Sequence, residues 1–493
     1  MSAPRPTLLA AAAVMVGLLS WACSPEASDP VRGEAETTVD GASLLQRAAA
    51  EADHGRDNKA GQLYAKALEL YSRNGDLPGQ GRALLGIATV ARNTGQGEVA
   101  RAKYKAALEV FLSAGDELGQ ADVHLALGEL DRSRFNDTAA LSQISTAARM
   151  FREQGRYASE VTAQLGISDL ERRAGRILAA RRAAGRADIL STLLRDESSA
   201  ETARRALAYL GRQPDEYELM RLRLRAELGQ ERAPGPLLIA TTSLNLGLVE
   251  ALAAELAAAR RELKIAAENF VLAGRHAQAA RAWLALANME LAADQPDAAA
   301  AALKSAKAEF DQSGDAAEML PEVAAELSIG LAEVAARNGE SIGDGFVAAR
   351  RLADASGSAD LIATAVLVEA HAHLRAARLE DAAAVLSSVV PAVLGGQTKG
   401  RVALARGDMR AARSEPSAAA TEYTAAVDAF VAANDRLWEG IARARLAAAL
   451  GAAGETTEAW VQAQLASRIL KMAGPDDRSM QLLGEPRPTI QRQ

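Results

Sequence analysis

Apolar residues recur at helical spacing from residue 41 onward, and between residues 61 and 156 the whole pattern repeats every 40 residues. Each repeat holds two segments with one apolar face and a length of roughly 14 to 18 residues, which is typical of helices. Gly75-Asp76 and Gly115-Asp116 occupy the same place in successive repeats. Glycine suits the left-handed position after a helix, and aspartate accepts hydrogen bonds at the start of the next one. The pattern therefore predicts pairs of helices joined by tight turns.

The second helix of each repeat carries small and large residues at fixed spacing. Small residues let neighbouring helices approach, and large side chains fill the space between them. We expect the following positions to pack the repeats together: Ala60, Tyr64, Ala67, Tyr71, Ala100, Tyr104, Ala107, Phe111, Ala140, Ile144, Ala147, Phe151, Ala259, Ala266, Phe270, Ala299, Ala306, Phe310, Ala419, Tyr423, Ala426 and Phe430. Such a period indicates a solenoid, because a single hairpin cannot bury its own apolar face.

The signature, with Leu85-Gly86 and Ala100-Tyr104-Ala107 at its characteristic positions, resembles the tetratricopeptide repeat family in its longer variant of 40 residues. The resemblance implies an all-α fold, a right-handed superhelical solenoid of stacked antiparallel helix hairpins. Counting periods between residues 41 and 474 predicts about eleven hairpins. The family resemblance also implies that the protein binds a protein or peptide partner.

The predicted organisation has six segments. They are a signal peptide (1–22), a flexible tether (23–40), an N-terminal array (41–192), a degenerate arginine-rich helical connection (193–235), a C-terminal array (236–474) and a disordered tail (475–493). The continuous phase of the repeat favours one superhelix, whereas Pro234-Gly235-Pro236 favours two separate arrays.

The N-terminus has the parts of an export signal. Arg5 precedes an apolar run of twelve residues, Leu8 to Leu19, which is too short to span a bilayer. The sequence Leu19-Ser20-Trp21-Ala22-Cys23 resembles a bacterial lipoprotein signal, although Ser20 and Trp21 depart from its usual residues. The resemblance implies that Cys23 is acylated and that the protein is an outer-membrane lipoprotein facing the periplasm. An ordinary signal-peptidase site, which would release a soluble periplasmic protein, is the alternative.

Composition narrows the function classes further. The chain has 493 residues, 49% of them apolar but only 4% aromatic, which suits closely stacked helices. Its net charge of −7 argues against bulk nucleic-acid binding. A single cysteine excludes disulfides within the chain and zinc sites built on several thiolates.

The sequence contains none of the common nucleotide-binding, zinc-protease or serine-hydrolase motifs. Of five histidines only His371 and His373 are near neighbours, and at this spacing on a helix they point in different directions. We therefore expect no catalytic residues, no cofactor and no metal.

Arginines are concentrated between residues 172 and 232, a stretch that contains fourteen arginines and nine acidic residues. One interpretation is a docking surface for an acidic protein or an envelope glycan, since arginine binds carboxylate and phosphate well. The other is an ordinary helix surface with local ion pairs. The candidate basic surface comprises Arg172, Arg173, Arg176, Arg181, Arg182 and Arg186.

The first helix of each clear repeat suggests a second surface. The family resemblance places nine apolar residues towards the concave side, as a groove for an amphipathic helix. The alternative is that they belong to the core. They are Ala83, Ile87, Val90, Val123, Leu127, Leu130, Ala163, Ile167 and Leu170.

These observations favour a non-catalytic adaptor, anchored to the cell envelope only through its lipid, that holds a protein or peptide partner and helps to assemble an envelope complex. A periplasmic module that binds or senses a ligand or glycan is the main alternative. A cytosolic regulator of the same fold follows if the export signal is misread.

Overall fold

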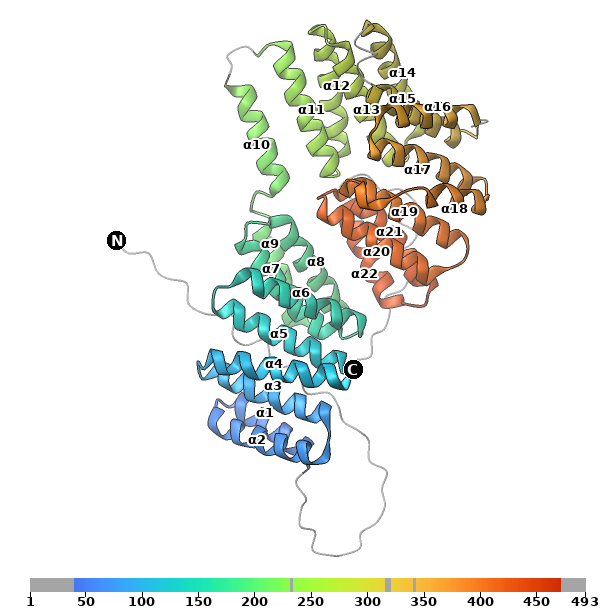
Figure 1. Ribbon diagram of the computed structural model, residues 1–493. Helices are drawn as coiled ribbons and strands as arrows, with labels where there is room; N and C mark the ends of the chain where they lie inside the picture. Colours follow the sequence, from blue (N-terminus) through green and yellow to red (C-terminus); the bar gives the residue numbers. More distant parts are fainter. Residues whose placement is uncertain (1–39, 231–233, 315–320, 340–342, 471–493) are drawn as a thin grey trace, which may run out of the picture. The chain divides into compact units, whose positions relative to one another are not determined.

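The computed structural model describes residues 40–230, 234–314, 321–339 and 343–470. Within these residues the chain forms 22 α-helices and no strand, which confirms the predicted all-α hairpin architecture (Figure 1). Cys23, the signal peptide and the predicted C-terminal tail from residue 475 lie outside the described residues.

The chain divides between Gln213 and Pro214 into two compact units, here called the N-terminal unit and the C-terminal unit. The helices of the N-terminal unit are α1 (Gly41–Asp53), α2 (Asp57–Asn74), α3 (Leu77–Asn93), α4 (Gly97–Ala114), α5 (Glu117–Ser133), α6 (Asp137–Glu153), α7 (Tyr157–Arg173), α8 (Ile177–Leu193) and α9 (Glu197–Leu210). Consecutive helices pack together from α1 to α9, so this unit is a row of stacked hairpins.

The C-terminal unit continues the hairpin pattern with less regular lengths. Its helices are α10 (Glu216–Gly229), α11 (Pro236–Leu252), α12 (Leu256–Leu272), α13 (His276–Ala292), α14 (Pro296–Gln312), α15 (Pro321–Arg337), α16 (Gly343–Ser356), α17 (Ala359–Arg375), α18 (Leu379–Ser387), α19 (Gly396–Ala412), α20 (Pro416–Ala432), α21 (Arg436–Ala452) and α22 (Thr456–Leu470), with a 3-10 turn at Pro391–Val393.

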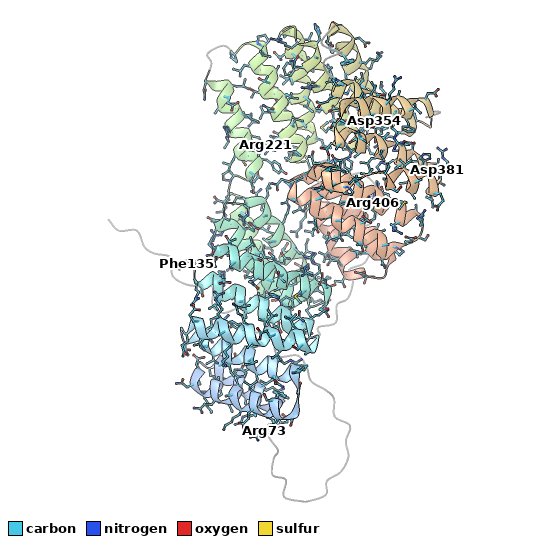
Figure 2. All side chains as sticks on the ribbon, viewed as in Figure 1. Arg73, Phe135, Arg221, Asp354, Asp381 and Arg406 are labelled. Atoms are coloured by element: carbon cyan, nitrogen blue, oxygen red, sulfur yellow. The ribbon has the colours of Figure 1, made fainter. Side chains whose placement is uncertain are left out.

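The turns have the chemistry that the sequence predicts. Gly75 and Gly115 follow α2 and α4 with φ angles of 69° and 65°, in the left-handed region that glycine enters without strain. Asp76 and Asp116 then accept a hydrogen bond from the backbone N–H of Gly79 and Gly119, each at 2.9 Å. Phe135, which is 87% exposed (Figure 2), occupies a comparable turn position with φ 58°.

The signature residues lie between hairpins. Phe111 of α4 is fully buried and contacts glycines on both neighbouring helices: a Cβ added at Gly81 or Gly119 would lie 2.5 or 2.3 Å from its ring. Tyr423 and Phe430 of α20 make the same kind of contact with Gly407 and Gly400 of α19. Glycine on one helix therefore makes room for a ring on the next, which allows the helices to approach closely.

The C-terminal unit closes on itself. Leu437 of α21 and Leu470 of α22 are buried in one core cluster with residues of α12 to α15, such as Leu284 and Leu327. α11 also contacts α21, and the Tyr217 hydroxyl of α10 donates a hydrogen bond to the Asn434 carbonyl. As a consequence, the first helices of several hairpins, which are far apart in the sequence, lie around one recess that is described below.

Candidate functional site

The apolar residues predicted to form a groove in the N-terminal unit divide into two groups. Six are buried between helices, at 0 to 5% exposure: Ala83, Val123, Leu127, Leu130, Ala163 and Leu170. Ile87, Val90 and Ile167 are half-buried. The six buried side chains pack between hairpins and do not line an open groove, because close helix packing covers this stripe of the first helices.

The predicted basic residues are engaged in local contacts. Arg172 and Arg173 pair with Asp169 at 2.7 and 3.1 Å, and Arg173 also pairs with Asp137 at 3.1 Å. Arg176 pairs with Glu171. Arg182 of α8 is half-buried.

Two members of this set have structural roles. Arg181 donates to the carbonyls of Leu210 and Gln213 at 2.8 and 3.0 Å, at the end of α9. Arg186 is only 5% exposed and donates to both carboxylate oxygens of Glu160, at 2.6 and 3.0 Å. Arg186 is therefore a core residue and not part of an exposed surface, since its fork is occupied by a fully buried carboxylate.

The C-terminal unit contains a charged recess of about 230 Å³, here called the bay. Four helices contribute to it: α13, α15, α19 and α21. Its lining residues are Asn288, Leu291, Ala292, Glu333, Arg337, Gln397, Thr398, Arg401, Asp435 and Trp438. Closure of the unit brings these helices together, since α19 and α21 follow α13 by more than a hundred residues.

A stack of three side chains leads from the core to the bay. Phe430 is fully buried and stacks on Trp438, with ring centroids 5.8 Å apart and planes inclined by 21°. The guanidinium carbon of Arg401 lies over the Trp438 ring, 5.4 Å from its centre. Gly400 gives the Phe430 ring its space. The repeat-packing aromatic thus fixes the tryptophan, and the tryptophan holds the plane of the arginine.

The other charged residues of the bay are satisfied by partners of their own. Arg337 donates to Asp294 at 2.7 Å and to Glu333 at 2.8 Å. Asp435 caps α21 by accepting from the Trp438 backbone N–H at 3.2 Å, and its second oxygen accepts from Gln397 at 2.9 Å.

Arg401 differs from these residues. Among the residues that the structure describes, no oxygen accepts a hydrogen bond from its guanidinium, and no carboxylate forms an ion pair with it. Burial lowers the pKa of Arg401, an effect that the more distant Glu333 and Asp435 only partly oppose. The arginine side chain has five donors, and Arg401 is one of the residues that line the bay.

The field in the bay also affects its carboxyl groups. Burial raises the pKa of Asp435 to about 6, although its two hydrogen bonds and Arg401 act in the opposite direction. Burial would raise the pKa of Glu333 too, but Arg337 and Arg401 outweigh it and lower that pKa below its ordinary value. Glu333 is therefore a permanent anion at neutral pH and is already matched by Arg337.

The two neighbouring histidines of α17 contact different groups. His371 lies 3.9 Å from Asp408, and burial lowers its pKa, so it is neutral at pH 7. His373 lies 3.7 Å from Asp381 and 3.9 Å from Glu369. Within the described ranges, no group of three or more histidine, cysteine or acidic side chains is placed to hold a metal ion.

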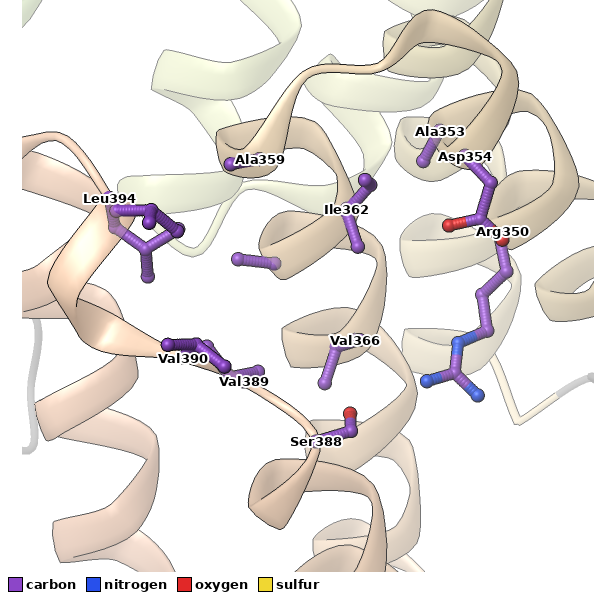
Figure 3. Close-up of a pocket in the computed structure, with 12 residues that line it drawn as sticks. Arg350, Ala353, Asp354, Ala359, Ile362, Val366, Ser388, Val389, Val390 and Leu394 are labelled. Atoms are coloured by element: carbon purple, nitrogen blue, oxygen red, sulfur yellow. The ribbon is translucent and has the colours of Figure 1, made fainter.

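A second recess lies beside α17, and it is here called the hollow. α18 ends after nine residues, and the chain then runs through Ser388 to Leu394 without an α-helix. The hollow that remains is about 450 Å³, and Figure 3 shows Ile362 and Val366 between the Arg350 side and the Val389–Leu394 side. Its walls are apolar apart from Arg350, Asp354 and Ser388.

Sequence reasoning did not identify the bay or the hollow. Both lie partly in the stretch from 311 to 400, where the repeat signature is weakest. One signal was present: Trp438 is one of only four tryptophans and stands on a first helix. The meeting of Trp438 with Arg401 depends on how α19 packs on α20, which spacing alone does not specify.

In the part of the chain that the structure describes, no helix is both long and apolar enough to cross a membrane.

No family model matches the sequence, and no curated protein matches it. Several solved structures match it at low similarity. A chain of the APC/C heterotetramer Cut9–Hcn1 has a TM-score of 0.36 and 12% identity, over 90% of this chain and 89% of that one. The apo form of the quorum sensor NprR from B. thuringiensis has a TM-score of 0.27 and 12% identity, over 78% and 97%.

A chain of the Naa15/Naa10 complex bound to HypK-THB has a TM-score of 0.27 and 15% identity, over 87% of this chain and 63% of that one. Within the described residues the chain is all-α, and its helices pair as stacked hairpins.

Proposed function

We propose that this protein is a non-catalytic scaffold that holds a protein or peptide partner at the bacterial cell envelope. The observation that carries the proposal is the bay, to which four separate helices of the C-terminal unit contribute. Stacked hairpins create extended binding surfaces in this way, by bringing residues from several repeats to one side. Polar donors beside an apolar wall suit a partner segment that has both kinds of group.

The proposed anchor is the acylated Cys23. Acyl chains bind a membrane by burying CH₂ groups, at about 0.8 kcal/mol each, and more than one chain makes the attachment stable. In the lipoprotein sorting pattern that this sequence resembles, a residue such as Ser24 after the cysteine, in place of an aspartate, favours the outer membrane. A soluble periplasmic protein and a cytosolic regulator are the alternatives, and they predict no lipid on Cys23.

Site-specific photocrosslinking in cells tests the scaffold. A photoreactive residue replaces Thr398 in the bay, and the matched control carries it at Lys304, an exposed residue of α14 outside the bay. We expect one defined envelope protein to crosslink through position 398 and not through 304. Cys23→Ala should release the protein from membranes and weaken this product. A folded protein that gives no product at 398 would contradict the proposal.

The second candidate function is binding or sensing of a small ligand or glycan, and the hollow favours it. Its volume of about 450 Å³ lies in the range of small-molecule pockets, and its walls are mostly apolar. Saturable thermal stabilisation by a small molecule, with no protein crosslink, would favour this function over the scaffold.

A further inference from the structure

The bay contains one guanidinium, that of Arg401, for which the described residues supply no direct hydrogen-bond or ion-pair partner. Arg337 is paired with Glu333 and Asp294, and both oxygens of Asp435 accept other hydrogen bonds. Arg401 donates to no oxygen among the described residues. Arg401 is half-buried and lines the bay, so its N–H groups are left to water or to an acceptor that enters the bay, and a carboxylate held there would form charge-assisted hydrogen bonds.

The geometry restricts what that acceptor is. Trp438 covers the guanidinium at 5.4 Å, and Arg401 itself lines the bay. Two parallel N–H groups of a guanidinium match the two oxygens of a carboxylate. Asn288, Gln397 and Thr398 place further polar groups around the same space, while Leu291, Ala292 and Trp438 supply an apolar wall.

Charge and size narrow the ligand further. Glu333 remains ionised beside Arg337, and Asp435 lies close to Arg401, so a dianion such as phosphate would be repelled by both. A monoanion matches the one unpaired guanidinium. The volume of about 230 Å³ admits a short organic group and no folded segment.

We propose that the bay binds a monocarboxylate with a short apolar part, held by the fork of Arg401 against Trp438. The carboxylate belongs either to a free small acid or to the end of a peptide. This site does not depend on the protein partner proposed above, because a free acid would bind even if the chain had no protein partner.

Calorimetric titration of the full chain tests the proposal. The probes are acetate, isovalerate, phenylacetate and N-acetyl-leucine, with N-acetyl-leucinamide as the uncharged control and inorganic phosphate as the dianion. We expect saturable binding of at least one apolar acid, at least tenfold weaker binding of the amide, and weaker binding of phosphate. A peptide that ends in leucine, with a free or an amidated C-terminus, separates the two sources. A site for peptide C-termini should bind the peptide with the free carboxylate more tightly than N-acetyl-leucine, whereas a site for free small acids should not.

Variants assign the binding to the fork. Arg401→Gln should weaken binding of the acid at least tenfold. Arg401→Lys keeps the charge but not the fork, so its affinity for the acid should lie between those of the wild type and Arg401→Gln. Arg406→Gln is the matched control on the same helix, since Arg406 (Figure 2) does not line the bay. It should bind like the wild type.

Three results would overturn the proposal: no binding of any acid up to about 10 mM, equal affinity for the acid and its amide, or unchanged affinity in Arg401→Gln. If Arg401→Gln fails to fold, comparing the affinities of the wild type for the acid and for its amide still tests whether the site recognises a carboxylate. If the photocrosslink at position 398 is absent while N-acetyl-leucine binds, the scaffold fails and the carboxylate site stands.

Discussion

In the N-terminal unit, α2 to α8 each run for 17 or 18 residues, whereas helices of the C-terminal unit range from 9 to 17 residues. Regular lengths let signature rings meet glycines of neighbouring helices, as Phe111 meets Gly81 and Gly119. The short α18 leaves the hollow. The comparison teaches that the strict repeat builds the scaffold and that a shortened helix opens the hollow.

The same contrast holds for two arginines. Arg186 in the N-terminal unit is buried and gives both arms of its fork to Glu160. Arg401 in the C-terminal unit stacks on Trp438 and has no carboxylate partner among the described residues. A paired buried arginine maintains the structure, whereas an unpaired one is available to a ligand. Three predictions sharpen this comparison.

The largest effect concerns the strict repeat. Phe111→Ala should lower the free energy of unfolding by about 3–5 kcal/mol, because it removes a fully buried ring and leaves a cavity beside two glycines. Chemical denaturation of the full chain measures it. Leu112→Ala, at a neighbouring position that is 56% exposed, is the control and should change stability by less than about 0.5 kcal/mol. An equal loss in both variants would contradict the role assigned to the ring.

The second effect separates the two arginines. Arg186→Gln should cost about 3 kcal/mol, because it leaves the buried Glu160 carboxylate with weaker partners. Arg401→Gln should leave the unliganded protein as stable as the wild type, since no ion pair is lost. Parallel thermal and denaturant unfolding measure both. If Arg401→Gln is the more damaging substitution, then Arg401 has a structural role and the comparison fails.

The smallest effect is a pH dependence at the bay. Because burial raises the pKa of Asp435 from 3.8 to about 6, the folded state binds its proton more tightly than the unfolded state does. Its contribution is therefore most favourable below pH 4 and is lost as the pH rises to about 6, by on the order of 2 kcal/mol. Asp435→Asn keeps a side-chain cap for α21 and should remove this slope.

The difference between wild type and Asp435→Asn is the quantity to measure, by unfolding at several pH values. Asp122 of α5 gives a slope of its own, because burial raises its pKa to about 7, and the subtraction removes it. A difference curve that is flat between pH 4 and 6 would show that Asp435 does not titrate as described. The outcome also bears on the ligand, since neutral Asp435 leaves more positive charge around Arg401.

The sequence by itself determined the repeating architecture. Helical periodicity, the 40-residue period and the glycine-aspartate turns depend on neighbours within a hairpin, and such local rules can be read along the chain. Gly75, Asp76 and Phe111 all lie where these rules predict. Which side of each first helix faces the core was harder to predict, because a shift of one position exchanges core and surface positions. Val123 and Leu127, predicted to line a groove, are buried in the core.

The tertiary structure alone decided the site. Asn288, Arg337, Arg401 and Trp438 come from four helices, and they meet because the last hairpin of the C-terminal unit packs back on α12 to α15. Small changes in packing between successive hairpins add up over such a distance, so local rules do not fix where its ends meet. Side-chain pairing also depends on the tertiary structure. Arg186 forms a buried ion pair with Glu160, whereas Arg401 stacks on Trp438 and has no carboxylate partner among the described residues.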